Sequence, residues 1–62
     1  MSRTSRIRFV TTVPLRGEGT WFFTFGPGYG LVHTGRWSQA RRRAALRAVA
    51  LGTDTVGVRV AR

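Results

Sequence analysis

The stretch GRWSQARRRAALRAVALG, residues 35–52, decides the expected fold class, because its apolar residues recur with the period of an α-helix. At 100° per residue, one face of that helix is a narrow stripe made mostly of alanine. The residues of the stripe are Trp37, Ala40, Ala44, Ala48 and Leu51. Ser38 can cap the N-terminus of the helix, and Gly52 suits the left-handed position that ends many helices. We therefore expect a helix that packs closely on a sheet through its alanines.

Four other segments have the composition and alternation of β-strands. They are RIRFVTTV (6–13), TWFFTF (20–25), LVHT (31–34) and TVGVRVA (55–61). The turn sequences PLRGEG and GPGYG separate the first three segments. Because the first two are close along the chain, we expect them to pair as an antiparallel hairpin. The order β-β-β-α-β predicts an α+β fold, a small antiparallel sheet with one helix packed on one face.

The small size of the chain restricts how it can be stabilised. Sixty-two residues make one domain, residues 1–62, near the lower limit for a self-sufficient core. The sequence has no cysteine, and His33 with only Glu18 and Asp54 cannot complete a zinc site. We therefore expect no metal and no other cofactor. Self-association is the remaining means of stabilisation, so we expect a homodimer.

The net charge of +9 arises from eleven arginines against two carboxylates. A field of this sign attracts polyanions, which include nucleic acid, acidic proteins and anionic membrane surfaces. No apolar run approaches the roughly 20 residues that span a bilayer, and no apolar signal-peptide core follows Arg3 and Arg6. We therefore expect a cytoplasmic protein without a membrane partner.

Arginine side chains form the candidate set for polyanion contact, because the planar guanidinium group matches phosphate oxygens. The set comprises Arg6, Arg8, Arg36, Arg41, Arg42, Arg43, Arg47 and Arg59. The alternative interpretation is a solvated helix face on which long arginine stems cover apolar surface. Consecutive arginines on a helix point about 100° apart, so the run Arg41–Arg43 does not form one flat patch.

Three apolar side chains fall on faces of the predicted strand and helix that point away from the expected core. Phe22 alternates away from Trp21 and Phe23, which suits a dimer contact or a stacked base. Leu46 and Val49 fall on the back of the predicted helix, where they form a contact patch or meet a partner. We interpret Phe22, Leu46 and Val49 as the candidate partner or dimer contacts.

No arrangement of residues in this sequence predicts catalysis. GPGYG precedes a strand, which excludes a dinucleotide-binding fingerprint and indicates a tight turn. His33 has only Glu18 and Asp54 as possible carboxylate partners, and both lie in turn sequences. Metal-dependent nuclease chemistry requires a carboxylate cluster that two acidic residues cannot supply. We expect no catalytic residues and a protein that is not an enzyme.

The run WFFTFGPGYGLVHTGRWSQARRRAALRAVAL, residues 21–51, resembles the HicB-like antitoxin family, particularly its short actinobacterial members. The shared features are an aromatic strand, a Pro/Gly turn, a short strand, an Ala-rich helix and a closing strand. They are carried by Trp21, Phe22, Pro27, Gly30, Leu31, Val32, Thr34, Arg36, Ala40, Ala44 and Leu51. The resemblance implies a partial RNase H-like β-β-β-α-β unit, of the type without the DNA-binding segment that other members carry.

The resemblance further implies a small non-enzymatic binding or regulatory module that acts through contact with an unidentified protein partner. The basic helix of this chain differs from the acidic helix that is usual in the family. The alternative hypothesis is a nucleic-acid-binding module whose arginine-rich helix contacts RNA or DNA phosphates. A weaker resemblance to double-stranded-RNA-binding domains, carried by Arg41–Arg43 at the start of an Ala-rich helix, illustrates that alternative.

Overall fold

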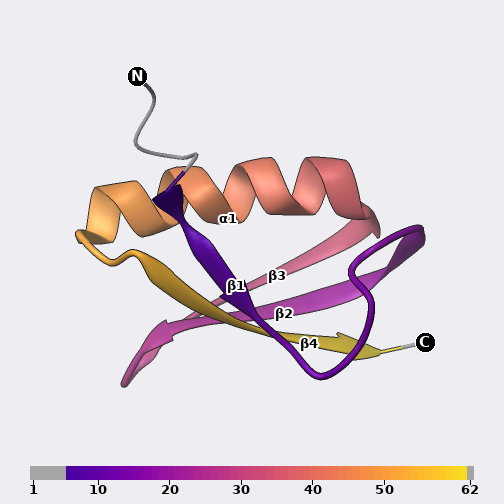
Figure 1. The fold of residues 1–62 in the computed structure, drawn as a ribbon, viewed down its shortest axis with the longest axis horizontal. Coiled ribbons are helices and arrows are strands. Elements are labelled where there is room, and N and C mark those ends of the chain that lie inside the picture. The colour runs from indigo at the N-terminus through magenta and orange to yellow at the C-terminus, as the bar shows by residue number, and fades with distance from the viewer. Residues whose placement is uncertain (1–5, 62) are drawn as a thin grey trace.

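The computed structural model describes residues 6–61 as a four-stranded sheet with one helix across one of its faces (Figure 1). The elements are β1 (Arg8–Val10), β2 (Glu18–Gly26), β3 (Tyr29–Arg36), α1 (Trp37–Leu51) and β4 (Thr55–Ala61). The predicted element order and the α+β class are confirmed. Strand β4 has its predicted bounds, β2 and β3 extend beyond theirs, and β1 is only three residues long.

The strands lie in the order β1-β4-β2-β3. The predicted all-antiparallel sheet is wrong in one pairing, because β1 runs parallel to β4 and the sheet is mixed. The predicted hairpin between the first two strands does not form, because β4 lies between them. Val56 and Val58 of β4 are buried, which suits a strand that is hydrogen-bonded along both edges. A three-residue strand such as β1 suits the edge of a sheet, where short strands limit unwanted pairing.

Strands β2 and β3 form the local hairpin of the sheet. Pro27 and Gly28 connect them, and the register shifts between Thr24 and Gly26 on the way into the turn. Gly28 has a φ of +81°, a conformation that costs other residues free energy and glycine very little. The GPGYG sequence is therefore a tight connection, as its composition predicts.

The core lies between α1 and the helix-facing side of the sheet. Trp21, Phe23 and Val56 are almost fully buried there, with at most 2% of their surface exposed. The helix contributes only small side chains to this layer, namely Ala40, Ala44, Ala45 and Ala48. Leu51, which the predicted stripe includes, is 38% exposed because the last turn of a helix has fewer neighbours. The buried side of α1 extends instead toward Ala45.

Trp37, the first residue of α1, joins the helix to the aromatic side chains of the sheet. Its ring centroid lies 4.9 Å from that of Trp21, 5.3 Å from that of Phe9 and 6.0 Å from that of Phe23. The Nε1–H group of the buried Trp21 donates a hydrogen bond to the carbonyl oxygen of Gly35 at 2.9 Å. We call Phe9, Trp21, Phe23 and Trp37 the aromatic cluster, and it determines where α1 begins on the sheet.

The chain passes directly from β3 into α1. Arg36 is the N-cap residue, with φ −75° and ψ 145°, and it makes no side-chain capping bond. The predicted Ser38 cap is wrong because Ser38 lies inside the first helical turn, while the amide of Trp37 donates to the carbonyl oxygen of Gly17 at 2.8 Å. Gly52 ends the helix as predicted, with φ +76°.

Helix α1 is 15 residues long and contains four arginines. Among residues 6–61, no helix combines the length and the apolar character that crossing a bilayer requires.

Replacement of Ala44 by leucine tests the close packing of α1 on the sheet. Ala44 has no exposed surface, so a larger side chain has to displace the helix or distort its neighbours. We expect Ala44→Leu to lower the free energy of unfolding by about 1–3 kcal/mol, measured by urea unfolding followed by far-UV circular dichroism. The matched control is Ala50→Leu on the exposed side of α1, with an expected change below about 0.5 kcal/mol. Equal losses in both variants would contradict this packing.

Candidate nucleic-acid interface

Helix α1 covers one face of the sheet, and among the described residues no helix or second sheet covers the other (Figure 1). Side chains alternate along a strand, so the burial of Trp21 and Phe23 turns Phe22 to the uncovered side. Phe22 is 39% exposed there, which confirms the predicted separation of Phe22 from its neighbours. We call this surface the open face, formed by Arg8, Val10, Thr20, Phe22, Thr24, Val32, Thr34, Gly57 and Arg59.

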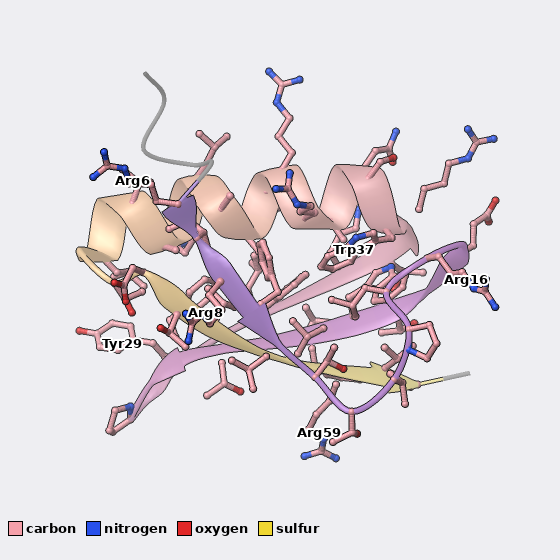
Figure 2. The ribbon with its side chains drawn as sticks, in the orientation of Figure 1. Arg6, Arg8, Arg16, Tyr29, Trp37 and Arg59 are labelled. Carbon is pink, nitrogen blue, oxygen red and sulfur yellow. The ribbon has the colours of Figure 1, made fainter. Side chains whose placement is uncertain are left out.

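Phe22 lies at the centre of the open face. In the register of the sheet it stands beside Arg59 of β4 on one side and Val32 of β3 on the other. Direct cross-strand neighbours have Cβ atoms about 4.5–5.5 Å apart, so these three side chains form one row. Arg59 points away from α1 (Figure 2). The row therefore presents an aromatic ring, a guanidinium group and an aliphatic side chain on one uncovered surface.

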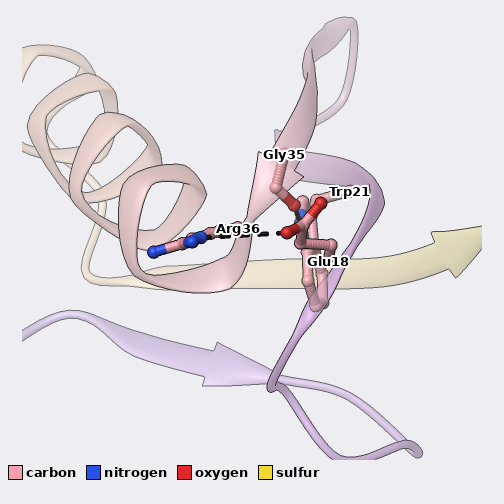
Figure 3. A network of polar contacts seen from close by, with 4 residues as sticks. All are labelled: Glu18, Trp21, Gly35 and Arg36. Atoms are coloured by element: carbon pink, nitrogen blue, oxygen red, sulfur yellow. Dashed lines mark hydrogen bonds and ion pairs between the residues drawn. The ribbon is translucent and has the colours of Figure 1, made fainter.

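The two carboxylates leave most of the positive charge unneutralised. Glu18 Oε1 lies 3.8 Å from Arg36 Nε (Figure 3), with about three quarters of each side chain exposed. An exposed pair of this kind contributes at most about 1 kcal/mol, and it is the one ion pair within residues 6–61. Asp54 accepts a hydrogen bond from the hydroxyl of Thr55 at 3.1 Å.

The eight candidate arginines are all exposed, and they lie on both layers of the fold. Four belong to α1: Arg41, Arg42, Arg43 and Arg47. Arg36 precedes the helix, and Arg6 precedes β1. Arg8 and Arg59 lie on the neighbouring strands β1 and β4, and the fold brings them to the open face although they are far apart in the sequence. The structure thus assembles a positive surface on each side of the sheet.

Arg41 differs from the other helix arginines because its guanidinium group lies over an aromatic ring of the protein. Its Cζ atom lies 5.7 Å from the centre of the Phe9 ring, within the range of a cation–π interaction. The contact lies on the same side of α1 as the aromatic cluster, so Arg41 covers an edge of the core. Part of the arginine set therefore stabilises the fold, as the alternative interpretation of the sequence expects.

The candidate partner contacts on α1 lie in different environments. Leu46 is 57% exposed, whereas Val49 is half-buried and packs against the core. Leu46 borders a shallow cavity of about 280 Å³ between α1 and β3. We call this cavity the α1–β3 groove; its lining residues are Leu31, Arg43, Leu46, Arg47 and Ala50. The apolar patch predicted on the back of α1 is thus reduced to Leu46.

Arg16, which is outside the predicted set of arginines, joins the basic residues near the start of α1. A cavity of about 380 Å³ beside the first turn includes Arg16, Arg36 and Trp37 in its lining. The first turn has no acidic residue and no side-chain cap, so the positive end of the helix dipole adds to these charges. Arg16 lies in the loop before β2, twenty residues before Arg36, and no local sequence pattern indicates that the two converge.

His33 alternates toward the helix-facing side of β3. Its Nε2 atom is buried and has no hydrogen-bond partner among the described residues. Residues 6–61 contain no group of three or more histidine, cysteine, aspartate or glutamate residues placed to hold a metal ion.

Comparisons of this chain with protein-family models, with curated proteins and with solved structures give no significant match. The interface is therefore interpreted from its own geometry and charge.

Replacement of Arg41 by glutamine tests whether Arg41 stabilises the fold more than a solvent-exposed arginine of the same helix does. We expect Arg41→Gln to lower the free energy of unfolding by about 0.5–1 kcal/mol relative to Arg42→Gln, because only the former loses a cation–π contact. Both variants lose one positive charge, so the comparison cancels the general effect of net charge. Thermal and urea unfolding provide the measurement, and equal stabilities would show that the contact with Phe9 contributes nothing.

Proposed function

We propose that this protein is a small non-enzymatic module that binds nucleic acid. The observation that carries the proposal is the set of eight exposed arginines, of which only Arg36 has a carboxylate partner within residues 6–61. Arginine is well suited to phosphate because its five donors are held in a rigid fork. A chain with a net charge of +9 also concentrates polyanions around itself through its long-range field.

The burial of the three candidate partner contacts, Phe22, Leu46 and Val49, favours a nucleic-acid ligand over a protein ligand. A protein partner on the back of α1 would require an apolar patch, but Val49 packs against the core and leaves Leu46 alone on that side. The open face, by contrast, carries Phe22 between Arg59 and Val32. Aromatic and basic side chains together are typical of surfaces that contact both bases and phosphates.

Salt-dependent binding tests the proposed function. Fluorescence anisotropy of labelled 10-nucleotide RNA and DNA strands and of a 20-base-pair duplex is measured with the full chain between about 20 and 300 mM salt, because phosphate contacts release counterions. We expect binding that weakens steeply with salt; four phosphate contacts on a single strand give a slope of about −3 in log K against log salt. The proposal fails if none of these probes binds at low salt with protein up to about 100 µM, the weak end of non-specific affinities.

A second candidate function is protein binding of the HicB-like, antitoxin-like regulatory kind. The α1–β3 groove supports it, because its lining combines apolar Leu31 and Leu46 with Arg43 and Arg47. Such a groove suits an apolar side chain from a partner whose flanking residues are acidic. A second copy of this chain is less suited to it, since both copies would bring the same two arginines to the contact.

A charge insertion at Leu46 tests this second candidate. We expect Leu46→Glu to abolish co-purification of a stoichiometric acidic protein from host lysate, while Leu51→Glu, at the exposed end of the same helix, retains it. Both variants change the net charge equally, so a loss confined to Leu46→Glu locates the contact in the groove. Recovery of no stoichiometric protein by the unmodified chain would argue against this function.

A further inference from the structure

We propose that the open face binds single-stranded nucleic acid, with an unpaired base stacked on Phe22 and phosphates held by Arg59 and Arg8. This inference rests on the proposed function and adds to it a location, a strand state and a mode of contact. Four observations support it: the exposure of Phe22, the position of the arginines, the absence of a side chain at Gly57 and the charge of the surface.

The exposed ring of Phe22 is the first observation. Phe22 lies in the middle of β2, an inner strand, with 39% of its surface exposed and with no covering layer in the described structure. The other aromatic side chains of β2, those of Trp21, Phe23 and Phe25, are at least 92% buried. An aromatic ring on an uncovered sheet offers a flat surface on which any base can stack, which contributes about 1–3 kcal/mol per base.

The second observation is the position of Arg8 and Arg59 relative to Phe22 on the open face, which they share on their side with the exposed Val10. In the order β1-β4-β2-β3, Arg8 and Arg59 lie on the β1–β4 side of Phe22, while Val32 lies on the β3 side. Thr55, which pairs with Arg8, precedes Arg59 by four residues, so the two arginines are offset by about 13 Å along the strands. A single-stranded nucleic acid whose phosphates lie on the β1–β4 side can therefore extend its bases over Phe22 toward Val32.

The third observation is Gly57. Because glycine has no side chain, the surface is flat next to the cross-strand row of Arg59, Phe22 and Val32. Gly57 pairs with Val10 and with Thr24 in the middle of β4, and the buried Val56 and Val58 on either side turn position 57 to the open face. Glycine weakens the interior of a strand and often marks the close approach of a ligand.

The backbone does not explain this glycine. The register is continuous through Gly57 in both pairings, and its φ is not positive. An added Cβ would meet Thr24 at ordinary contact distances of 3.7–3.8 Å, so a side chain fits the folded protein. Gly30, on the same face, differs because it lies next to the register shift of the β2–β3 hairpin. The space above Gly57 is therefore open, and a planar base fits such a flat surface beside an aromatic ring.

The fourth observation, the charge of the face, selects among possible occupants. A second copy of the chain would bring its own Arg8 and Arg59 against the same residues and add another nine positive charges. Glu18, the first residue of β2, is paired with Arg36. A duplex keeps its bases stacked inside, so it cannot place one on Phe22. A single-stranded nucleic acid can do both: its phosphates bind the arginines, and an accessible base stacks on the ring of Phe22.

Substitutions at Phe22 test the stacked base. We expect Phe22→Ala to weaken binding of 10-nucleotide uridine and thymidine strands by about 5- to 150-fold, with duplex binding unchanged, and Phe22→Tyr to retain most of the affinity. Leu46→Ala is the matched control, because it removes an exposed apolar side chain outside the open face. Thermal unfolding of each variant verifies that the fold persists. Equal strand affinities for Phe22→Ala and the unmodified chain would overturn the inference.

Two further comparisons test the phosphate contacts and the flat place. Arg8→Gln/Arg59→Gln and Arg42→Gln/Arg43→Gln each lower the net charge from +9 to +7, and we expect the first pair to weaken single-strand binding at least several-fold more than the second. Gly57→Val keeps every charge and the Phe22 ring but fills the space beside it, and it should also weaken binding. Equal losses in the two arginine pairs, with no effect of Gly57→Val, would contradict the proposed location.

The remaining outcomes separate failure of this inference from failure of the proposed function. Amide chemical shifts recorded with the uridine strand should change along β2 and β4 on the open face. If duplex and single strand bind alike and the changes are confined to α1, nucleic-acid binding stands and the open-face site is wrong. If no probe binds, both proposals fail. If sedimentation shows a dimer that Phe22→Ala dissociates, the open face is a contact between copies, and the inference is wrong.

Discussion

The close contact between the alanine side of α1 and the aromatic side of β2 is the constraint on which the rest of this structure depends. Ala40, Ala44 and Ala48 have no exposed surface, so the helix lies near enough for Trp21 and Phe23 to fill the layer beneath it. Large side chains on one element and small ones on the other are a means of reaching interior packing density in a chain this short. Trp37 and the hydrogen bond from Trp21 to Gly35 then orient the start of the helix.

This single contact layer has a consequence for the opposite side of the sheet. Residues 6–61 supply one helix, and that helix covers one face, so within this part of the chain the other face keeps its side chains exposed. Phe22 and Val32 are exposed for that reason, and Arg59 stands beside them in the register. The same small size that limits the core therefore creates a broad surface. Because the chain carries a net charge of +9, that surface is better suited to an anionic ligand than to a second copy of the chain.

The features that sequence predicted correctly are those that depend on local periodicity or on one residue's backbone preference. The helix, its alanine stripe, the Gly52 stop, strand β4 and the outward orientation of Phe22 belong to this group. The features it missed depend on which elements meet. Ser38 was a reasonable cap by residue type, but β3 continues into α1 without a loop and moves the start of the helix to Trp37. Val49 lies on the back of an ideal helix, yet it is partly buried against the core and lines a cavity with Arg6 and Ile7, the residues that precede β1.

The sequence by itself determined the element order, the α+β class, the core aromatics and the excess of positive charge. These follow from residue chemistry and from the two periods, 3.6 and 2, that any helix or strand imposes on its side chains. Only the tertiary structure decided that β4 separates β1 from β2, that Arg8 and Arg59 share the open face, and that Gly57 lies beside the row of Phe22. The physical reason is that strand pairing is a competition between edges far apart in the chain. Its outcome depends on which arrangement buries Val56 and Val58 beneath the helix, and no local pattern encodes that choice.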